Sequence, residues 1–358
     1  MQKGLNRTMV IGTNCVSADI RINNGITYDD ILIKPRYCSF SRKNIDTNTV
    51  FLSHKFSMPV LVAPMDTIIS FNMMRVLSKL GITGVIHRFQ SATEQAAMVK
   101  RIKWESSFPI YAAVGTKDIH SRLPLLIAAG VNVYVIDVAH GHHQLVHDTI
   151  QYIKSKDDNC KVIAGNVATG EGAIFLEQSG ADAIRVGLGC GSVCTTRTTT
   201  GVGVPQLTAI YECSRATSLP IIADGGIKCA GDITKALIFG ADIVMIGGLL
   251  AGTDESSGDL VSKDGISYKK YRGLSSKVLN PDGPEGVEAL VPLRGPAAKI
   301  IGTLQQHLIN SMGYIGCKTV NEVQILEISN KTLVMASHST HKENIPHIGL
   351  NESVIIDG

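Results

Sequence analysis

Eight short apolar runs recur along the chain, and each is followed by a stretch with helical signals. The runs cover residues 60–64, 82–87, 110–115, 133–138, 162–166, 183–187, 221–224 and 243–246. Aliphatic and β-branched residues fill these runs almost continuously, which is typical of strands buried on both faces. Because buried strands alternate with helices, the pattern predicts a parallel sheet.

Helices are predicted between the runs. The sequence Ser91-Ala92-Thr93-Glu94 resembles a helix cap, and glycines follow the segments 118–129, 169–179 and 231–239. Eight strand–helix units favour an α/β fold that closes into a (β/α)8 TIM barrel. A doubly wound open sheet is the structural alternative.

No linker or low-complexity stretch divides the chain, so we expect a single domain over residues 1–358. We expect a barrel core at 59–250, an active-site excursion at 251–294, and C-terminal helices with a tail at 295–358. Within the last part, helices are predicted at 296–311 and 319–328.

Composition narrows the class of protein. The chain is 44% hydrophobic and 18% charged, with a formal net charge of +3, as in an ordinary globular protein. This near-balance of charge gives no support for binding nucleic acid or a membrane. Residues 1–24 lack the pattern of a signal peptide, and the eight cysteines lack paired spacing. We therefore expect a cytoplasmic protein with free thiols.

The strongest chemical signal is the segment 187–206, GLGCGSVCTTRTTTGVGVPQ, which follows the sixth run. Its alternating glycines and Ser192 allow backbone N–H groups to face a phosphate. Cys194 lies beside these dipoles, which favour its thiolate and hence a nucleophile. A small buried hydrophobe is the alternative reading of a lone cysteine. The carbonyls of Gly189, Gly191 and Cys194 are candidate ligands of a monovalent cation such as K⁺.

Glycine turns end the last two runs. Asp224-Gly225-Gly226 follows the seventh run and Gly247-Gly248 the eighth, where barrels commonly bind phosphate. The Asp224 carboxylate is suited to a ribose diol. Ordinary strand-ending turns are the alternative for each pair.

Two metal sites suggested by the sequence are not favoured. Asp137 lies near His140, His142 and His143, but no second set of carboxylate and histidine ligands supports a metal. Cys190 and Cys194 lack histidine partners for zinc. We therefore expect Asp137 to face a cofactor, although no GxGxxG motif indicates a Rossmann site.

The chain resembles the IMP dehydrogenase/GMP reductase family over nearly its whole length. The matching segments are Thr27-Tyr28-Asp29-Asp30-Ile31-Leu32, Ala63-Pro64-Met65-Asp66-Thr67, Asp137-Val138-Ala139-His140-Gly141-His142, Ala164-Gly165-Asn166-Val167, the Cys194 loop, Ala223-Asp224-Gly225-Gly226, Tyr271-Arg272-Gly273 and Met312-Gly313-Tyr314. The resemblance implies a (β/α)8 barrel, a homotetramer, a bound purine mononucleotide and a nicotinamide cofactor.

The resemblance also implies roles for individual residues. Cys194 would form a covalent adduct at purine C2, assisted by Thr196 and by the acidic Glu285. Nucleotide contacts are expected at Ser192, Asp224, Gly226, Gly247, Gly248 and Ser275. Cofactor contacts are expected at Asp137, Asn166 and Arg88.

Several features favour the reductase branch, with NADPH as cofactor. Lys103 runs almost directly into the third strand at Ile110, so the regulatory insertion usual in the dehydrogenases is absent. Dehydrogenases hydrolyse the adduct with water activated by an Arg-Tyr pair, and no such pair lies between Ser276 and Glu285. Gly247-Gly248 also stands where dehydrogenases tend to have Gly-Ser.

Other features keep alternatives open. Residues 60–88 and 284–288 resemble bacterial dehydrogenases, and Cys190 stands where the family usually has proline. The alternatives are an IMP dehydrogenase that uses NAD and a non-catalytic purine-nucleotide-binding protein. Among the residues, only Arg88 is a candidate reader of the NADPH 2′-phosphate.

Overall fold

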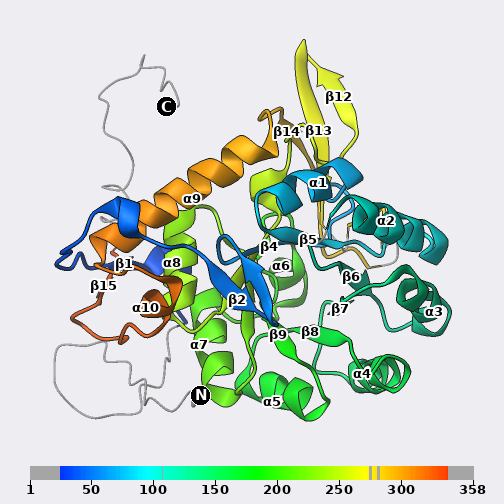
Figure 1. The fold of residues 1–358 in the computed structure, drawn as a ribbon, viewed down its shortest axis with the longest axis horizontal. Helices are drawn as coiled ribbons and strands as arrows, with labels where there is room; N and C mark the ends of the chain where they lie inside the picture. Colours follow the sequence, from blue (N-terminus) through cyan, green and yellow to red (C-terminus); the bar gives the residue numbers. More distant parts are fainter. Residues whose placement is uncertain (1–24, 107, 274–275, 280–282, 338–358) are drawn as a thin grey trace.

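A computed structural model of the chain describes residues 25–106, 108–273, 276–279 and 283–337. Eight parallel strands form a closed barrel (Figure 1). They are β4 (Val60–Val62), β5 (Thr83–Ile86), β6 (Tyr111–Val114), β7 (Val133–Asp137), β8 (Lys161–Val167), β9 (Ala183–Val186), β10 (Ile221–Asp224) and β11 (Ile243–Ile246). The barrel closes where β11 pairs with β4, with Val244 opposite Val60. The predicted (β/α)8 barrel is confirmed, and the open sheet is wrong.

Helices connect successive barrel strands and cover the outside of the barrel. They are α1 (Phe71–Lys79), α2 (Ala92–Glu105), α3 (Ile119–Ala129), α4 (Gln144–Lys156), α5 (Gly170–Gln178), α7 (Gln206–Ala216) and α8 (Ala230–Ile238). The cap predicted at α2 is present, because Ser91 Oγ accepts the Glu94 N–H and the Glu94 carboxylate accepts the Ser91 N–H. Gly130 ends α3 in the left-handed conformation at φ 86°.

Additional elements lie at the edges of the barrel. Strand β1 (Ile31–Ile33) pairs with β15 (Leu333–Met335), and β2 (Thr49–Phe51) forms a hairpin with β3 (His54–Phe56). The short α6 (Thr196–Thr200) begins just after Cys194.

The two C-terminal helices differ in length from the prediction. Helix α9 (Ala297–Tyr314) runs three residues beyond the predicted end at 311 and packs along α8. Helix α10 (Val320–Gln324) is shorter than the predicted 319–328. The buried Leu326 and Ile328 belong to the irregular segment that follows α10, and their apolar character resembled a continued helix.

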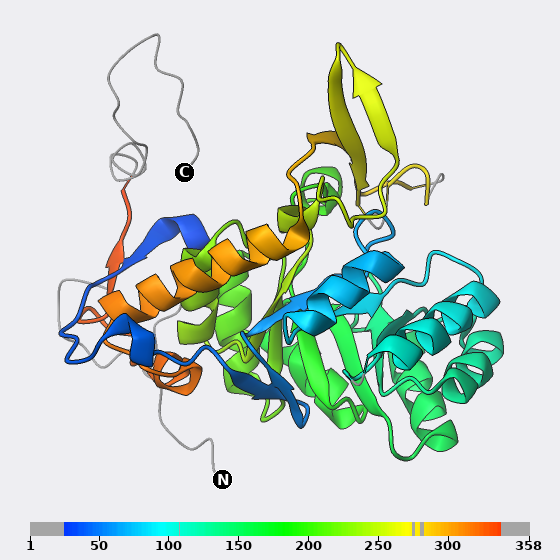
Figure 2. The same cartoon turned by 45° about the horizontal axis from the view of Figure 1, so that its top comes forward.

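The excursion at 251–294 contains an antiparallel sheet that the sequence did not predict. Its strands are β12 (Leu260–Lys263), β13 (Ile266–Arg272) and β14 (Glu288–Pro292). The β12–β13 hairpin projects from the barrel (Figure 2), and most of its side chains remain exposed. Because so little of the sheet is buried, its sequence lacks the apolar runs that marked the barrel strands.

None of the helices in the described ranges is long and apolar enough to cross a membrane.

Candidate active site

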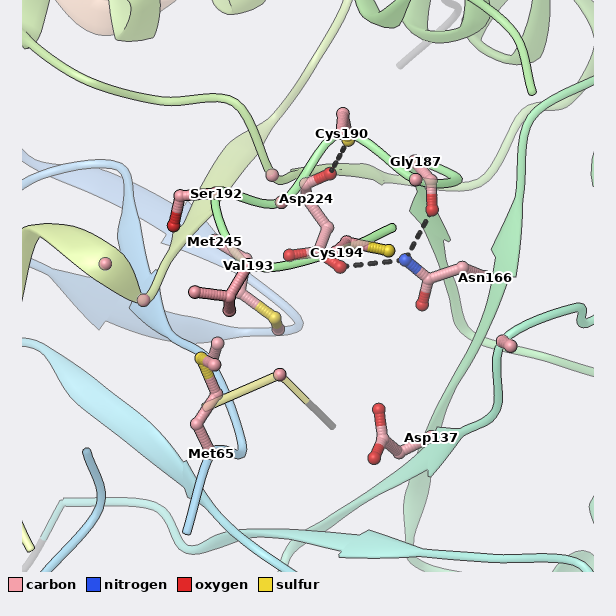
Figure 3. Close-up of a pocket in the computed structure, with 18 of the residues that line it drawn as sticks. Met65, Asp137, Asn166, Gly187, Cys190, Ser192, Val193, Cys194, Asp224 and Met245 are labelled. Atoms are coloured by element: carbon pink, nitrogen blue, oxygen red, sulfur yellow. Dashed lines mark hydrogen bonds between the residues drawn. The ribbon is translucent and has the colours of Figure 1, made fainter. Parts of the chain in front are cut away.

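A cavity of about 1090 Å³ opens at the carboxyl ends of the barrel strands. Every barrel strand contributes a lining residue at or just beyond its end: Met65, Arg88, Gly115, Asp137, Asn166, Gly187, Asp224 and Gly247. Figure 3 shows Met65, Asp137, Asn166 and Asp224 around one open space, with Cys194 beside it. Parallel strands aim their carboxyl ends at one face of a barrel, which explains why these distant residues meet.

Three side chains form a continuous chain of contacts at one wall of the cavity. Cys194 Sγ lies 3.1 Å from Thr196 Oγ1, and Thr196 Oγ1 donates to Glu285 Oε2 at 2.7 Å. Thr196 is the first residue of α6, so the helix fixes its position two residues after Cys194. The threonine hydroxyl has a single proton. When it donates to the carboxylate, its oxygen can accept the Cys194 S–H, and a proton can thereby pass from sulfur to carboxylate.

Backbone contacts fix Glu285 against the Cys194 loop. The Thr195 N–H donates to the Glu285 carbonyl at 2.8 Å, and the Val287 N–H donates to the Val193 carbonyl at 2.9 Å. Cys194 and Gly286 form an antiparallel bridge. The segment after β13 therefore supplies Glu285, the third residue of this chain of contacts, although Glu285 lies about ninety residues from Thr196 in the sequence.

A second wall brings hydroxyl groups and glycines together. Ser192 Oγ lies 3.2 Å from Tyr271 Oη. A Cβ at Gly248 would lie 2.8 Å from Ser192 Oγ and 3.2 Å from Tyr271 Oη, so glycine fits here without displacing either hydroxyl. Burial raises the pKa of Tyr271, so its phenol stays protonated and can donate. Gly226, at φ +78°, also lines the cavity, and a Cβ there would lie 3.2 Å from the ring of Tyr28.

One oxygen of the Asp224 carboxylate accepts hydrogen bonds from other side chains of the protein. Oδ2 accepts from Asn166 Nδ2 at 2.8 Å and from Arg185 Nε at 2.9 Å. Asn166 Nδ2 also donates to the Gly187 carbonyl at 2.7 Å (Figure 3). Both amide hydrogens of Asn166 are thus used within the protein. A ligand can be met by Asp224 Oδ1 and Asn166 Oδ1, which are both acceptors.

Asp137 lies between two arginines. Its Oδ1 accepts from Arg185 Nη1 at 2.6 Å, and Arg88 Nε lies 3.4 Å from its Oδ2. Arg88 also donates to the Asp137 carbonyl at 3.2 Å. The Arg88 side chain is 31% exposed, so it can also face a ligand.

The predicted site residues that the structure describes all line this one cavity. They are Arg88, Asp137, Asn166, Gly189, Gly191, Ser192, Cys194, Thr196, Asp224, Gly226, Gly247, Gly248 and Glu285. Ser275 lies outside the described residues. Of the candidate cation ligands, the Gly191 carbonyl already accepts the Cys194 N–H at 3.0 Å. The individual roles of these residues stay predictions.

Arg185 and Tyr271 are among the cavity residues that were not predicted from the sequence. Arg185 is the only charged residue in the apolar run 183–187, and a charge in a fully buried strand requires partners. That signal could have identified it. Tyr271 belongs to the matched segment Tyr271-Arg272-Gly273, but nothing in the sequence indicated that its hydroxyl meets Ser192.

Cys190 differs from Cys194 in its surroundings. Its sulfur lies 3.1 Å from the Asp224 carbonyl and 3.2 Å from Gln206 Oε1. Burial raises the pKa of Cys190 to about 12, and the Asp224 carboxylate adds to this effect. Its thiol therefore remains a donor that ties the loop to the end of β10. The seven cysteines in the described residues are free.

The histidines after β7 lie on the surface near the cavity. His140 and His142 have ring centroids 6.2 Å apart, and His142 packs on Phe175. In the described ranges, no group of three or more His, Cys, Asp or Glu side chains is arranged to hold a metal ion.

Comparison with known proteins gives a match to the IMP dehydrogenase / GMP reductase domain family over residues 25–347. The GMP reductase of Clostridium acetobutylicum is 37% identical over 84% of this chain and 94% of its own length. The IMP dehydrogenase of Borreliella burgdorferi is 33% identical over 90% of this chain and 96% of its own length.

The IMP dehydrogenase of Chlorobaculum parvum is 43% identical over 66% of this chain and 52% of its own length. The chain thus spans about half the length of this relative, whereas the alignments with the Clostridium and Borreliella proteins cover nearly all of theirs. Both activities occur among the relatives at similar identity, so identity alone does not separate them.

Proposed function

Because this chain belongs to the IMP dehydrogenase/GMP reductase family of oxidoreductases, we propose that it is a GMP reductase. The reaction would convert GMP to IMP and ammonia, with NADPH as the hydride donor. The observation that carries the proposal is the contact chain Cys194–Thr196–Glu285 beside a segment without a water-activating pair.

The contact chain fits the removal of an amino group. The Cys194 sulfur would bond to purine C2, and its proton would pass through Thr196 to Glu285. Glu285 would return that proton through Thr196 to the departing amino group, which leaves as ammonia when the C2–N bond breaks. A positioned acid–base pair of this kind typically contributes about 10²–10⁴-fold to a rate.

The adduct left on Cys194 then requires a hydride. A nicotinamide cofactor held near Arg88, Asp137 and Asn166 would supply the hydride to C2, and the C2–S bond would break with its electron pair on the Cys194 sulfur. IMP would be released, and the Cys194 thiolate would recover a proton from solvent. The cavity volume of about 1090 Å³ slightly exceeds the usual 300–1,000 Å³ for a ligand site, which is consistent with room for a nucleotide beside a nicotinamide.

The lack of an Arg-Tyr pair in residues 276–285 supports the reductase branch. Hydrolysis of the adduct needs a general base within hydrogen-bond reach of a water. Residues 276–285 contain neither arginine nor tyrosine. The close approach of Gly248 to Ser192 and Tyr271 also fits the Gly-Gly pair expected in the reductase branch.

IMP dehydrogenase with NAD is the second candidate. The segments 60–88 and 284–288, which resemble bacterial dehydrogenases, favour it. Catalysis in that direction would require a base from a residue other than an Arg-Tyr pair in 276–285.

Paired assays of the purified protein test the proposal. With GMP and NADPH we expect loss of NADPH absorbance and equal amounts of IMP and ammonia. With IMP and NAD we expect no XMP. Stable NADPH together with formation of XMP and NADH would identify a dehydrogenase instead. If neither reaction proceeds while GMP or IMP binds, the chain is a non-catalytic nucleotide-binding protein.

The variant Cys194→Ala distinguishes catalysis from binding. We expect it to abolish turnover and to keep nucleotide affinity within about threefold, because the phosphate and ribose contacts remain. We also propose a cytoplasmic homotetramer that uses K⁺. Light scattering tests the oligomeric state, and assays with K⁺ replaced by Na⁺ test the use of K⁺.

A further inference from the structure

Arg185 connects the two sides of the cavity. Its side chain is only 4% exposed, and it donates from Nε to Asp224 Oδ2 and from Nη1 to Asp137 Oδ1, at 2.9 and 2.6 Å. The two carboxylates lie at the ends of β10 and β7, on opposite sides of β9. One guanidinium therefore fixes both carboxylates.

Strand β8 provides the space for this connection. Gly165 stands in register between Asp137 on β7 and Arg185 on β9. A Cβ at Gly165 would lie 2.7 Å from Arg185 Cβ. The lack of a side chain at this position lets Arg185 reach across β8 to Asp137.

The contacts leave defined atoms free for ligands. Among the described residues, the hydrogen bonds to the Asp224 carboxylate fall on Oδ2, which leaves Oδ1 for a ligand in the cavity. Asp137 is held by Arg185 on Oδ1 and faces Arg88 on Oδ2. Figure 3 shows Asp137 and Asp224 bordering the same space.

The electrostatic balance supports a positioning role. Burial opposes the charge of Arg185, but Asp224 and Asp137 outweigh it and raise the pKa of the guanidinium. Two carboxylates with two arginines leave the network neutral. A buried ion pair is by itself weak evidence for stability, because desolvation offsets its attraction. This network can instead serve to fix the positions of Asp137 and Asp224 relative to each other.

We propose that Arg185 is a positioning residue that holds the nucleotide-side carboxylate Asp224 and the cofactor-side carboxylate Asp137 as one rigid unit. Binding on either side is thereby coupled to binding on the other. This inference rests on the proposed function, since it takes Asp224 to face the ribose and Asp137 to face the cofactor.

The first test is Arg185→Lys in a Cys194→Ala background, where no reaction follows binding. Affinities for GMP and IMP, and separately for NADP⁺ and NAD⁺, are measured by calorimetry. A lysine keeps the charge but cannot hold two carboxylates in the fixed planes of a guanidinium. We expect the affinities for nucleotide and for cofactor each to fall about tenfold.

The second test is Asp137→Asn, with nucleotide affinity measured in the absence of cofactor. Without Asp137, the guanidinium loses the contact that fixes its plane, and its charge falls on Asp224 alone, which weakens Oδ1 as an acceptor. We expect nucleotide affinity to fall about tenfold, and this effect to disappear when Arg185 is already lysine. The matched control Asp182→Asn removes an ion-paired carboxylate at the opposite end of β9 and should leave nucleotide affinity unchanged.

The outcomes separate this inference from the proposed function. Arg185→Lys that weakens only one ligand, or Asp137→Asn that leaves nucleotide affinity unchanged, would overturn the coupling. If GMP and IMP bind and show the coupling while the GMP and NADPH assay fails, the reductase proposal alone is wrong. Thermal unfolding of each variant confirms that it folds. If Asp137→Asn does not fold, the coupling is tested by Arg185→Lys alone, which must weaken both nucleotide binding and cofactor binding.

Discussion

Thr196 donates its single hydroxyl proton to Glu285 at 2.7 Å, so it has none left for Cys194, which lies 3.1 Å from the same oxygen. We therefore predict that Thr196→Val and Glu285→Gln each lower kcat for GMP reduction by about 10²-fold or more. Each change interrupts the same proton path, so the double variant should be hardly slower than either single one. Steady-state rates of NADPH consumption measure this.

Thr198→Val is the matched control for the relay. Thr198 lies on the same short helix, but its hydroxyl donates to the Thr195 carbonyl and does not meet Glu285. Its kcat should remain within about twofold of the unmodified enzyme. Multiplicative losses in the Thr196 and Glu285 double variant would show that the two residues act independently, contrary to a shared path.

Gly248 should be required for nucleotide affinity. In Gly248→Ala, the new Cβ would lie 2.8 Å from Ser192 Oγ and 3.2 Å from Tyr271 Oη, so the serine hydroxyl must turn away. Because these hydroxyls are expected to bind phosphate, we predict that KM for GMP rises about tenfold while kcat changes little. Steady-state kinetics with varied GMP check this.

Gly302→Ala provides the comparison, since it is the same substitution on the exposed surface of α9. A Cβ there meets nothing within 4 Å. We expect unchanged KM and a free energy of unfolding higher by about 0.5–1 kcal/mol, from improved helix propensity. An equal rise of KM in both variants would argue against a phosphate site at Gly248.

The barrel could be predicted because its strands are buried on both faces. Residues 133–136 are apolar without interruption, as is typical of a strand buried on both faces. Asp224 ends β10, and Cys194 and Gly248 lie in the segments that follow β9 and β11, so the barrel places all three at its carboxyl face. The exposed sheet β12–β14 could not be predicted, since its mostly solvated strands have no such pattern.

Contacts across the cavity could not be derived from the sequence. Glu285 reaches Thr196 only because the segment after β13 folds back onto the Cys194 loop. Only the family resemblance suggested that pairing. Arg185 could be noticed in the sequence as a charge inside an apolar run. Its contacts with Asp137 and Asp224, however, depend on the curvature of the barrel and on the lack of a side chain at Gly165.

Asp182 should make stability depend on pH in a defined direction. Burial opposes its ionisation, but hydrogen bonds from Lys154, at 2.5 Å, and from the Val162 N–H outweigh burial and lower the pKa of Asp182. A carboxyl with a lowered folded-state pKa stabilises the fold above its unfolded value of about 3.9, and this stability is lost as pH falls through the folded value.

We therefore predict that Asp182→Asn lowers the free energy of unfolding by about 1 kcal/mol near pH 7 and by less at about pH 3, which is below the unfolded-state value of about 3.9. Urea unfolding at the two pH values measures the difference. A loss of the same size at both values would assign the effect to packing and not to charge.

Cys190 and Cys194 should differ sharply in reactivity although both line the cavity. Alkylation requires a thiolate, and a pKa of about 12 leaves Cys190 only about one part in ten thousand ionised at pH 8. Its sulfur is also enclosed between the Asp224 carbonyl and Gln206. We predict that iodoacetamide at pH 8 modifies Cys194, that GMP protects Cys194, and that Cys190 reacts only after unfolding in urea.

Peptide mass spectrometry over a time course distinguishes the two sites. Modification of Cys190 in the folded protein at a rate close to that of Cys194 would mean that the loop opens, and that Cys190 does not tie it to the end of β10.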